Sequence, residues 1–165
     1  MENKIERLTV EAVELLKEMI SIPSPSFEED AVCGHVCKWL TDHGVEHRRV
    51  GNNIIAEHIA DPTRPTLMLC AHMDTVSPCE GYGFDPYSPD YETAAEVIGR
   101  ISGQKVRPED IVAGLGSNDD GASVVSMLAV YRYFNDTWCC GSGFQNNPSH
   151  SFGAGPSPCG QGDST

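Results

Sequence analysis

The spacing of apolar residues along the first part of the chain predicts two amphipathic helices. Apolar side chains recur at helical intervals over residues 9–20, where Thr9 is placed to cap the first turn. The sequence IPSPS then ends this helix, because a residue that precedes proline disfavours helical backbone. Ser26 followed by Glu29 matches the capping-box pattern, so a second helix is predicted to start at Ser26 and to end at Gly44.

Shorter apolar runs in the middle of the chain predict strands. Residues 45–50 and 54–59 lie on either side of Gly-Asn-Asn, which is a turn signal. Residues 66–71 form the most apolar short run, which is typical of a central strand covered on both faces. Further on, a short helix is predicted at 94–98, and a short strand and a glycine turn precede a helix over 121–134.

This alternation of helices and strands predicts an α/β sandwich for residues 1–134. The remaining segment, 135–165, contains no Lys or Arg and has no apolar period. Gly, Ser, Pro and Asn dominate it, so its composition predicts a disordered or non-native tail. The chain is therefore expected to hold one domain followed by an atypical end.

The net charge of the chain disfavours two classes of binding partner. The chain carries 24 acidic and 11 basic residues, a formal charge of −13. Nucleic acid and anionic membrane surfaces are therefore not expected as partners, because both require a basic surface. The N-terminal sequence MENKIERLTVEAVELL is too charged for a signal peptide, and no apolar run reaches the roughly 20 residues of a membrane span. These features predict a cytoplasmic protein.

Seven cysteines are expected to be reduced thiols, since no secretory signal accompanies them. Cys33 and Cys37 lie one helical turn apart around His35, in CGHVC. This group could hold a metal ion, but no second Cys/His cluster with zinc-finger spacing completes it.

The sequence LMLCAHMDTV places a histidine and an aspartate where the predicted central strand ends. Ligands of open α/β sheets gather beyond the carboxyl ends of strands, which is where His72 and Asp74 fall. A neutral imidazole is a common ligand of zinc, cobalt or manganese, and a carboxylate behind it can orient the ring. His-x-Asp alone is also compatible with a hydrogen-bonded histidine at a strand end.

A second polar group, GLGSNDDG, stands where a short strand and a glycine turn lead into a helix. Asp119 or Asp120 could cap that helix, because a carboxylate satisfies free backbone N–H groups and suits the helix dipole. Capping explains one aspartate more readily than two, so a metal-binding role remains open beside it.

Taken together, the two motifs resemble the M20 metallopeptidase and deacylase family. HMDTV and GLGSND match its two signatures, in the family's order, and the GYGFDPYSP loop is most similar to acetylornithine deacetylase-like members. The resemblance covers about residues 5–134. It implies the N-terminal part of a catalytic domain built as a three-layer α/β/α sandwich with a mixed, mostly parallel sheet.

The resemblance also implies roles for individual residues. His72 would be a terminal ligand of one metal and Asp119 would bridge two metals, with zinc expected and cobalt or manganese as alternatives. Asp74 would orient His72 or the general base, and the Asp119–Asp120 peptide bond could be cis.

Two such metals would activate a water that attacks an amide carbonyl. The implied reaction is deacetylation of N-acetylornithine, in arginine biosynthesis. Related M20 desuccinylases and di- or tripeptidases are the alternatives, and full-length relatives form homodimers.

The chain departs from this family beyond the second motif. The family's downstream Glu-Glu pair, which supplies the general base and a ligand, has no counterpart, since no Glu follows Glu109. The acids that remain are Asp136 and Asp163, and the histidine is His150; none is assigned a role. Residues 147–154, read one nucleotide later, could encode an apolar strand, so a frameshifted tail is one hypothesis.

Two functional hypotheses of different classes follow. The chain is either a metal-dependent hydrolase of N-acyl amino acids or short peptides, or a non-catalytic fragment with a weak metal site. The identified ligands are too few for rapid turnover, so this chain is expected to be weakly active or inactive.

Overall fold

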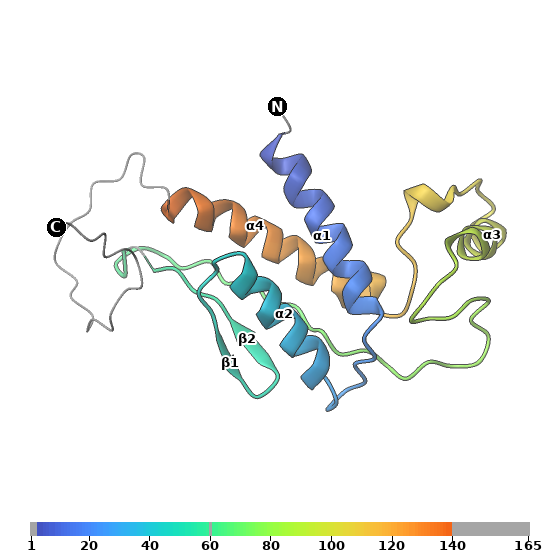
Figure 1. The fold of residues 1–165 in the computed structure, drawn as a ribbon, viewed down its shortest axis with the longest axis horizontal. Coiled ribbons are helices and arrows are strands. Elements are labelled where there is room, and N and C mark those ends of the chain that lie inside the picture. The colour runs from blue at the N-terminus through green and yellow to red at the C-terminus, as the bar shows by residue number, and fades with distance from the viewer. Residues whose placement is uncertain (1–2, 60, 140–165) are drawn as a thin grey trace, which may run out of the picture.

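The computed structural model describes residues 3–59 and 61–139 of the chain. Four α-helices make up most of the regular structure of these residues, together with two short strands and two short helical turns. In chain order these elements are α1 (Lys4–Ile20), α2 (Asp30–Asp42), β1 (Arg48–Val50), β2 (Asn53–Ile55), α3 (Tyr91–Ser102), η1 (Pro108–Asp110), η2 (Ser117–Gly121) and α4 (Ala122–Cys139). Figure 1 shows α1 crossing α4, with α2 and the β1–β2 hairpin to one side and α3 at the far end.

Helix α1 starts earlier than the sequence predicts. Asn3 caps it by accepting a hydrogen bond from the Ile5 N–H at 3.2 Å, and Glu6 completes the capping box. The prediction of Thr9 as the cap is wrong, because its hydroxyl donates to the Ile5 carbonyl inside the helix at 2.9 Å. The predicted end at Ile20 is confirmed.

The hydrophobic core lies among α1, α2 and the start of α4. Leu15, Val32 and Leu40 are each only 1% exposed. The predicted apolar faces of the first two helices are therefore confirmed as core faces, and burial of this kind is the main favourable term in folding. The buried cluster comprises Ala12, Leu15, Leu16, Met19, Ile20, Val32, Val36, Leu40, Val45, Val124 and Val125.

Helix α2 begins at Asp30 rather than at Ser26. Glu29 occupies the capping position without a side-chain cap, and Ser26 donates its hydroxyl to Asp74 Oδ2 at 2.6 Å. The capping-box prediction is wrong because a residue distant in sequence takes the Ser26 hydroxyl. The predicted end is confirmed, since Gly44 follows the helix with a φ of 66°.

The described residues contain one sheet, formed by β1 and β2. The two strands pair antiparallel, with Arg49 opposite Ile54, so the two predicted strands exist but are shorter than expected. The described residues therefore form a mixed α/β domain with a small sheet. They do not form the expected three-layer sandwich with a mostly parallel sheet.

Residues 66–71 are not a buried central strand. Leu67 and Met68 are both 83% exposed, and the segment has no regular strand structure. The prediction fails because a covered central strand needs a neighbour on each side, and β1 and β2 pair with each other instead. Residues 111–116 also lack the predicted strand.

Helix α3 extends beyond the predicted 94–98, because Asp90 caps its start and Gly103 ends it with a φ of 71°. The last predicted helix is confirmed as α4, which continues past Phe134 to Cys139. Residues 140–165, most of the predicted tail, lie outside the described part of the chain. Within the described part, no helix has the length and apolar character needed to cross a membrane.

Candidate metal site

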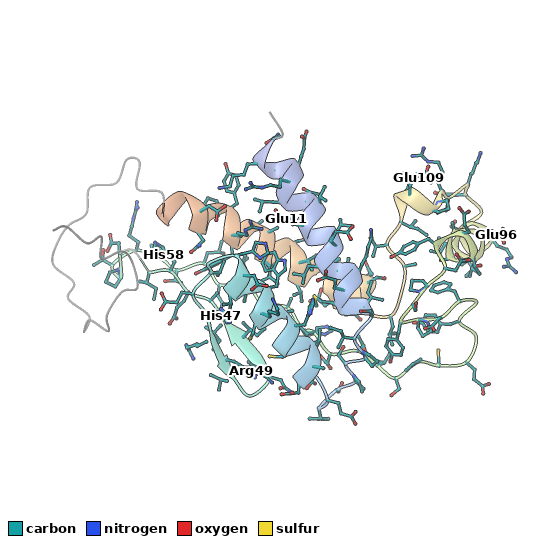
Figure 2. All side chains as sticks on the ribbon, viewed as in Figure 1. Glu11, His47, Arg49, His58, Glu96 and Glu109 are labelled. Carbon is teal, nitrogen blue, oxygen red and sulfur yellow. The ribbon has the colours of Figure 1, made fainter. Side chains whose placement is uncertain are left out.

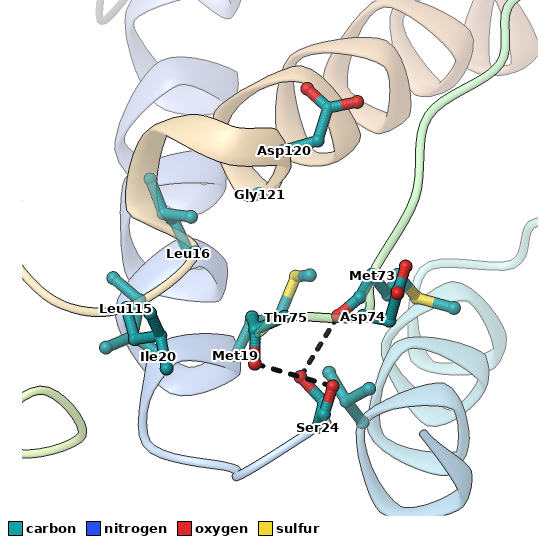
Figure 3. Close-up of a pocket in the computed structure, with 12 residues that line it drawn as sticks. Leu16, Met19, Ile20, Ser24, Met73, Asp74, Thr75, Leu115, Asp120 and Gly121 are labelled. Atoms are coloured by element: carbon teal, nitrogen blue, oxygen red, sulfur yellow. Dashed lines mark hydrogen bonds between the residues drawn. The ribbon is translucent and has the colours of Figure 1, made fainter. Parts of the chain in front are cut away.

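The His-x-Asp motif lies beside the loop that joins α1 to α2. The Thr75 N–H donates to the Ser24 carbonyl at 2.8 Å, and the Ser24 hydroxyl donates to the Met73 carbonyl at 3.0 Å. Pro25 and Thr75 form an isolated parallel bridge. Ser24 is buried, at 3% exposure, and Figure 3 shows the hydrogen bonds that join it to Met73 and Thr75. These contacts fix the backbone that carries His72 and Asp74.

The glycine turn of the second motif packs directly against the first motif. Gly116 has a φ of 77°, a backbone conformation that side chains disfavour, and a Cβ there would lie 2.7 Å from Thr75 Cγ2. The Gly121 N–H closes the turn by donating to the Gly116 carbonyl at 2.9 Å. Glycine at position 116 therefore permits the close approach that brings Asp119 to the histidine.

The side chains of the two motifs meet at His72. Its Nε2 atom lies 3.1 Å from Asp119 Oδ1, and its Nδ1 atom lies 3.1 Å from Asp74 Oδ1. The Asp74 backbone carbonyl is 3.2 Å from the same Nδ1 atom. The structure thus brings together the three residues that the sequence singles out, with Asp74 and Asp119 on opposite sides of the imidazole.

The two adjacent aspartates of the second motif face different cavities. Asp119 lines a cavity of about 290 Å³ together with His72, whereas Asp120 lines a small cavity beside Leu16. Figure 3 shows the Asp120 carboxylate directed away from Ser24 and Thr75. The Asp119–Asp120 peptide bond is cis, as the family resemblance implies. Capping does not account for Asp119, because its side chain contacts His72.

The electrostatics of the site favour a charged pair when no metal is bound. The hydrogen bond from Ser26 lowers the pKa of Asp74 below its ordinary value, and the nearby His72 adds to this effect. Partial desolvation lowers the pKa of His72, but the Asp74 carbonyl and the charges of Asp74, Asp119 and Asp120 outweigh it, so the pKa is raised overall. A metal cation would replace the proton on this imidazole.

The two converging side chains are of the types that bind zinc, but a catalytic zinc site uses more protein ligands than these two. His72 Nε2 and Asp119 Oδ1 converge, and imidazole nitrogen and carboxylate oxygen are both zinc ligands. Catalytic zinc sites use three protein ligands. Within residues 3–59 and 61–139, no group of three or more His, Cys, Asp or Glu side chains is arranged to hold a metal. The described residues therefore supply part of a ligand set.

The alternative metal group in CGHVC is not assembled. Cys33 is fully buried, and His35 turns to α1, where its Nε2 atom lies 2.9 Å from Glu18 Oε2. His35 is therefore a hydrogen-bonded histidine in the structure.

Two features of the cavity were not predicted from the sequence. Ser26 reaches the site, although its sequence pattern indicates a helix cap. Tyr82 and Val76 form an apolar part of the cavity wall, and the Tyr82 ring packs edge-on against Phe84 with centroids 5.9 Å apart. The aromatic residues of GYGF were the available signal for this wall.

Comparison with known proteins decides the family. The family model for peptidase family M28 matches residues 53–149, more than half of the chain, including both motifs. The chain belongs to peptidase family M28. Peptidases of this family are typically zinc-dependent, which supports the use of a divalent metal. The expected metallopeptidase class is therefore confirmed, whereas membership of M20 and likeness to acetylornithine deacetylase in particular are not supported.

A curated relative points to the same class of protein. A probable carboxypeptidase of Emericella nidulans is 29% identical to this M28 chain in an alignment of 121 residues that covers 69% of the chain. The match spans only 24% of the relative's own length.

Proposed function

We propose that this chain contributes the His–Asp part of a metal-dependent active site that hydrolyses a linear amide bond. One observation carries the proposal: His72 Nε2 lies 3.1 Å from Asp119 Oδ1, although the two residues come from motifs 47 positions apart. A bound divalent metal would polarise the amide carbonyl and lower the pKa of an attacking water.

The chain's own residues have distinct roles in this proposal. His72 would hold a divalent ion through Nε2, and Asp119 would be a carboxylate ligand shared by two such ions, zinc by preference and cobalt or manganese otherwise. Asp74 accepts the Nδ1 proton of His72, which leaves the Nε2 lone pair for the metal. Within residues 3–59 and 61–139 no further His, Cys, Asp or Glu completes this ligand set, and no residue of the chain is assigned as the general base.

Two substrate classes are candidates. N-acetylornithine and related N-acyl amino acids follow from the motifs and the aromatic loop. A peptide with a free carboxyl terminus follows from the relative, which is described as a probable carboxypeptidase. The apolar wall formed by Tyr82 and Val76 favours a substrate with an apolar side chain, and this supports the peptide.

A zinc titration followed by two hydrolysis assays tests the proposal. Calorimetry on the chain should detect zinc binding that His72→Ala abolishes and that His47→Ala retains. His47 is the matched control because its ring bonds to the Val45 carbonyl on the far side of α2, near the hairpin (Figure 2). N-acetylornithine and an N-blocked dipeptide are then supplied separately with zinc.

The outcomes separate an enzyme from a non-catalytic fragment. Slow hydrolysis of one substrate that is lost in His72→Ala supports the proposal and identifies the substrate class. Zinc binding without hydrolysis supports a fragment that retains a partial site. Absence of zinc binding, or binding that survives in His72→Ala, contradicts the proposal.

A further inference from the structure

The hydrogen bonds at the candidate site continue one residue beyond Asp74. Ser26 Oγ donates to Asp74 Oδ2 at 2.6 Å, while Asp74 Oδ1 lies 3.1 Å from His72 Nδ1. The opposite side of the imidazole then faces Asp119. Ser26, Asp74, His72 and Asp119 therefore form one continuous series, in which each carboxylate oxygen of Asp74 has its own partner.

The orientation of Asp74 needs such a support. Its side chain is 36% exposed, and rotation about the terminal bond of an aspartate has broad, shallow minima. A hydroxyl bonded to one oxygen selects a single orientation. In that orientation the other oxygen faces His72 Nδ1.

We propose that Ser26 is a positioning residue of this site. By fixing the Asp74 carboxylate, it holds the His72 ring in the orientation that presents Nε2 to Asp119. This inference rests on the proposed function for its purpose, since Nε2 is the atom that would bind a metal.

The loop around Ser26 is built to hold the hydroxyl in place. On one side, Ser24 and Pro25 are tied to the Met73–Thr75 backbone by hydrogen bonds and the parallel bridge. On the other side, Glu29 accepts a hydrogen bond from the Phe27 N–H at 2.6 Å and another from Asn52 Nδ2 at 2.8 Å.

The backbone at Phe27 indicates the same role. Phe27 has a φ of 75° and is 96% exposed, so it gains little burial from this conformation. A positive φ at a bulky residue is unfavourable and persists only where surrounding contacts impose it. The contacts on either side of Phe27 impose it here, and the result places Ser26 against Asp74 rather than at the start of α2.

The inference is tested on the full chain by NMR of nitrogen-15-labelled histidine, together with zinc titration. At pH 8 the Nδ1 atom of His72 should carry a proton in the unsubstituted chain. Ser26→Ala should lower the fraction of rings that carry a proton on Nδ1. It should also weaken zinc binding severalfold, by less than the roughly 10-fold or more expected when a group bonded directly to a metal ligand is removed.

Three further variants make the result specific. Ser26→Thr keeps the hydroxyl and should restore both readouts. Ser26→Cys keeps the shape with a weaker donor, should give an intermediate result, and replaces Ser26→Ala if that variant fails to fold. Ser21→Ala removes a hydroxyl that bonds only to the end of α1, at Glu18, and should match the unsubstituted chain.

The inference and the proposed function fail in different ways. If Ser26→Ala, or Ser26→Cys in its place, retains both the tautomer and the zinc affinity of the unsubstituted chain, the positioning role is refuted. If the unsubstituted chain binds no zinc, the proposed function is refuted, and the tautomer measurement still decides the role of Ser26.

Discussion

At the scale of single residues, the site depends on side chains that act on their neighbours. His72 is oriented by Asp74, Asp74 is held by Ser26, and Asp119 is brought close because Gly116 has no side chain. The two sequence motifs predict His72, Asp74 and Asp119 as site residues, and the structure places these three side chains together. Sequence reasoning missed Ser26, because a serine before an acidic residue also matches a local helix cap.

Replacement of Gly116 is predicted to disturb both stability and the site. Gly116→Ala should lower the free energy of unfolding by about 1–3 kcal/mol, because it adds an unfavourable φ and a contact with Thr75 Cγ2. Urea denaturation measures the change. Gly51→Ala is the matched control, since Gly51 has a φ of 61° and no atom lies within 4 Å of the place that its Cβ would take. Equal losses in the two variants would show that the contact with Thr75 is unimportant.

The lowered pKa of Asp90 predicts how the stability of α3 depends on pH. The Thr93 hydroxyl and then the Thr93 N–H lower the pKa of Asp90 below its ordinary value of 3.8. A lowered pKa means that the capping contact stabilises α3 above pH 3.8 and is lost as pH falls through the lower folded value. Carbon-13 NMR of the Asp90 carboxyl should show a midpoint below 3.8, and Thr93→Val should move it upward. A midpoint unchanged by Thr93→Val would contradict this assignment.

At the scale of elements, the sequence predicts each helix and both strands of the hairpin, whereas the strands predicted at 66–71 and before the second motif are absent from the described residues. Each predicted helix exists, because periodic apolar faces and local caps are encoded within a few residues. The run at 66–71 was predicted as a central strand from its composition, but strand pairing depends on partners elsewhere in the chain. Leu67 is 83% exposed because the described residues provide no such partner for it.

An ion pair joins the elements of the core. Arg132 of α4 pairs with Glu11 of α1, and its guanidinium lies 5.6 Å from the Trp39 ring centroid of α2. Figure 2 shows Glu11 near the crossing of α1 and α4. The Arg132 side chain is only 11% exposed, so loss of its charge leaves Glu11 without this partner in a half-buried position.

Arg132→Met is therefore predicted to destabilise the helical core. The expected loss is about 1.5–3 kcal/mol, the range for hydrogen bonds to charged groups, and thermal or urea unfolding measures it. Lys38→Met is the matched control, because the Lys38–Asp42 pair on α2 is largely exposed and pairs of that kind contribute at most about 1 kcal/mol. A similar small effect in both variants would refute a structural role for the Arg132–Glu11 pair.

At the scale of the whole molecule, an exposed apolar run stands apart from a well-packed helical core. Leu67, Met68 and Leu69 are 83%, 83% and 50% exposed on an extended segment. Contiguous exposed apolar residues with unpaired backbone groups promote association between chains.

Leu67→Lys is predicted to reduce self-association of the chain. Sedimentation velocity over a range of concentrations should show fewer dimers and larger species in the variant. Ile101→Lys is the matched control, since Ile101 is 81% exposed but lies in the last turn of α3, away from the extended run. If both variants associate as the unsubstituted chain does, the run at 66–71 is not the surface responsible.

The way the site is assembled has a consequence for the order of folding. The contacts between Ser24 and Thr75 and between His72 and Asp119 close loops of 51 and 47 residues. Closure of long loops costs chain entropy before any contact repays it, so such contacts form late. During synthesis, His72 can contact Asp119 only after the second motif has left the ribosome. Zinc binding through both motifs would therefore report that the second motif has packed against the first in a nascent chain.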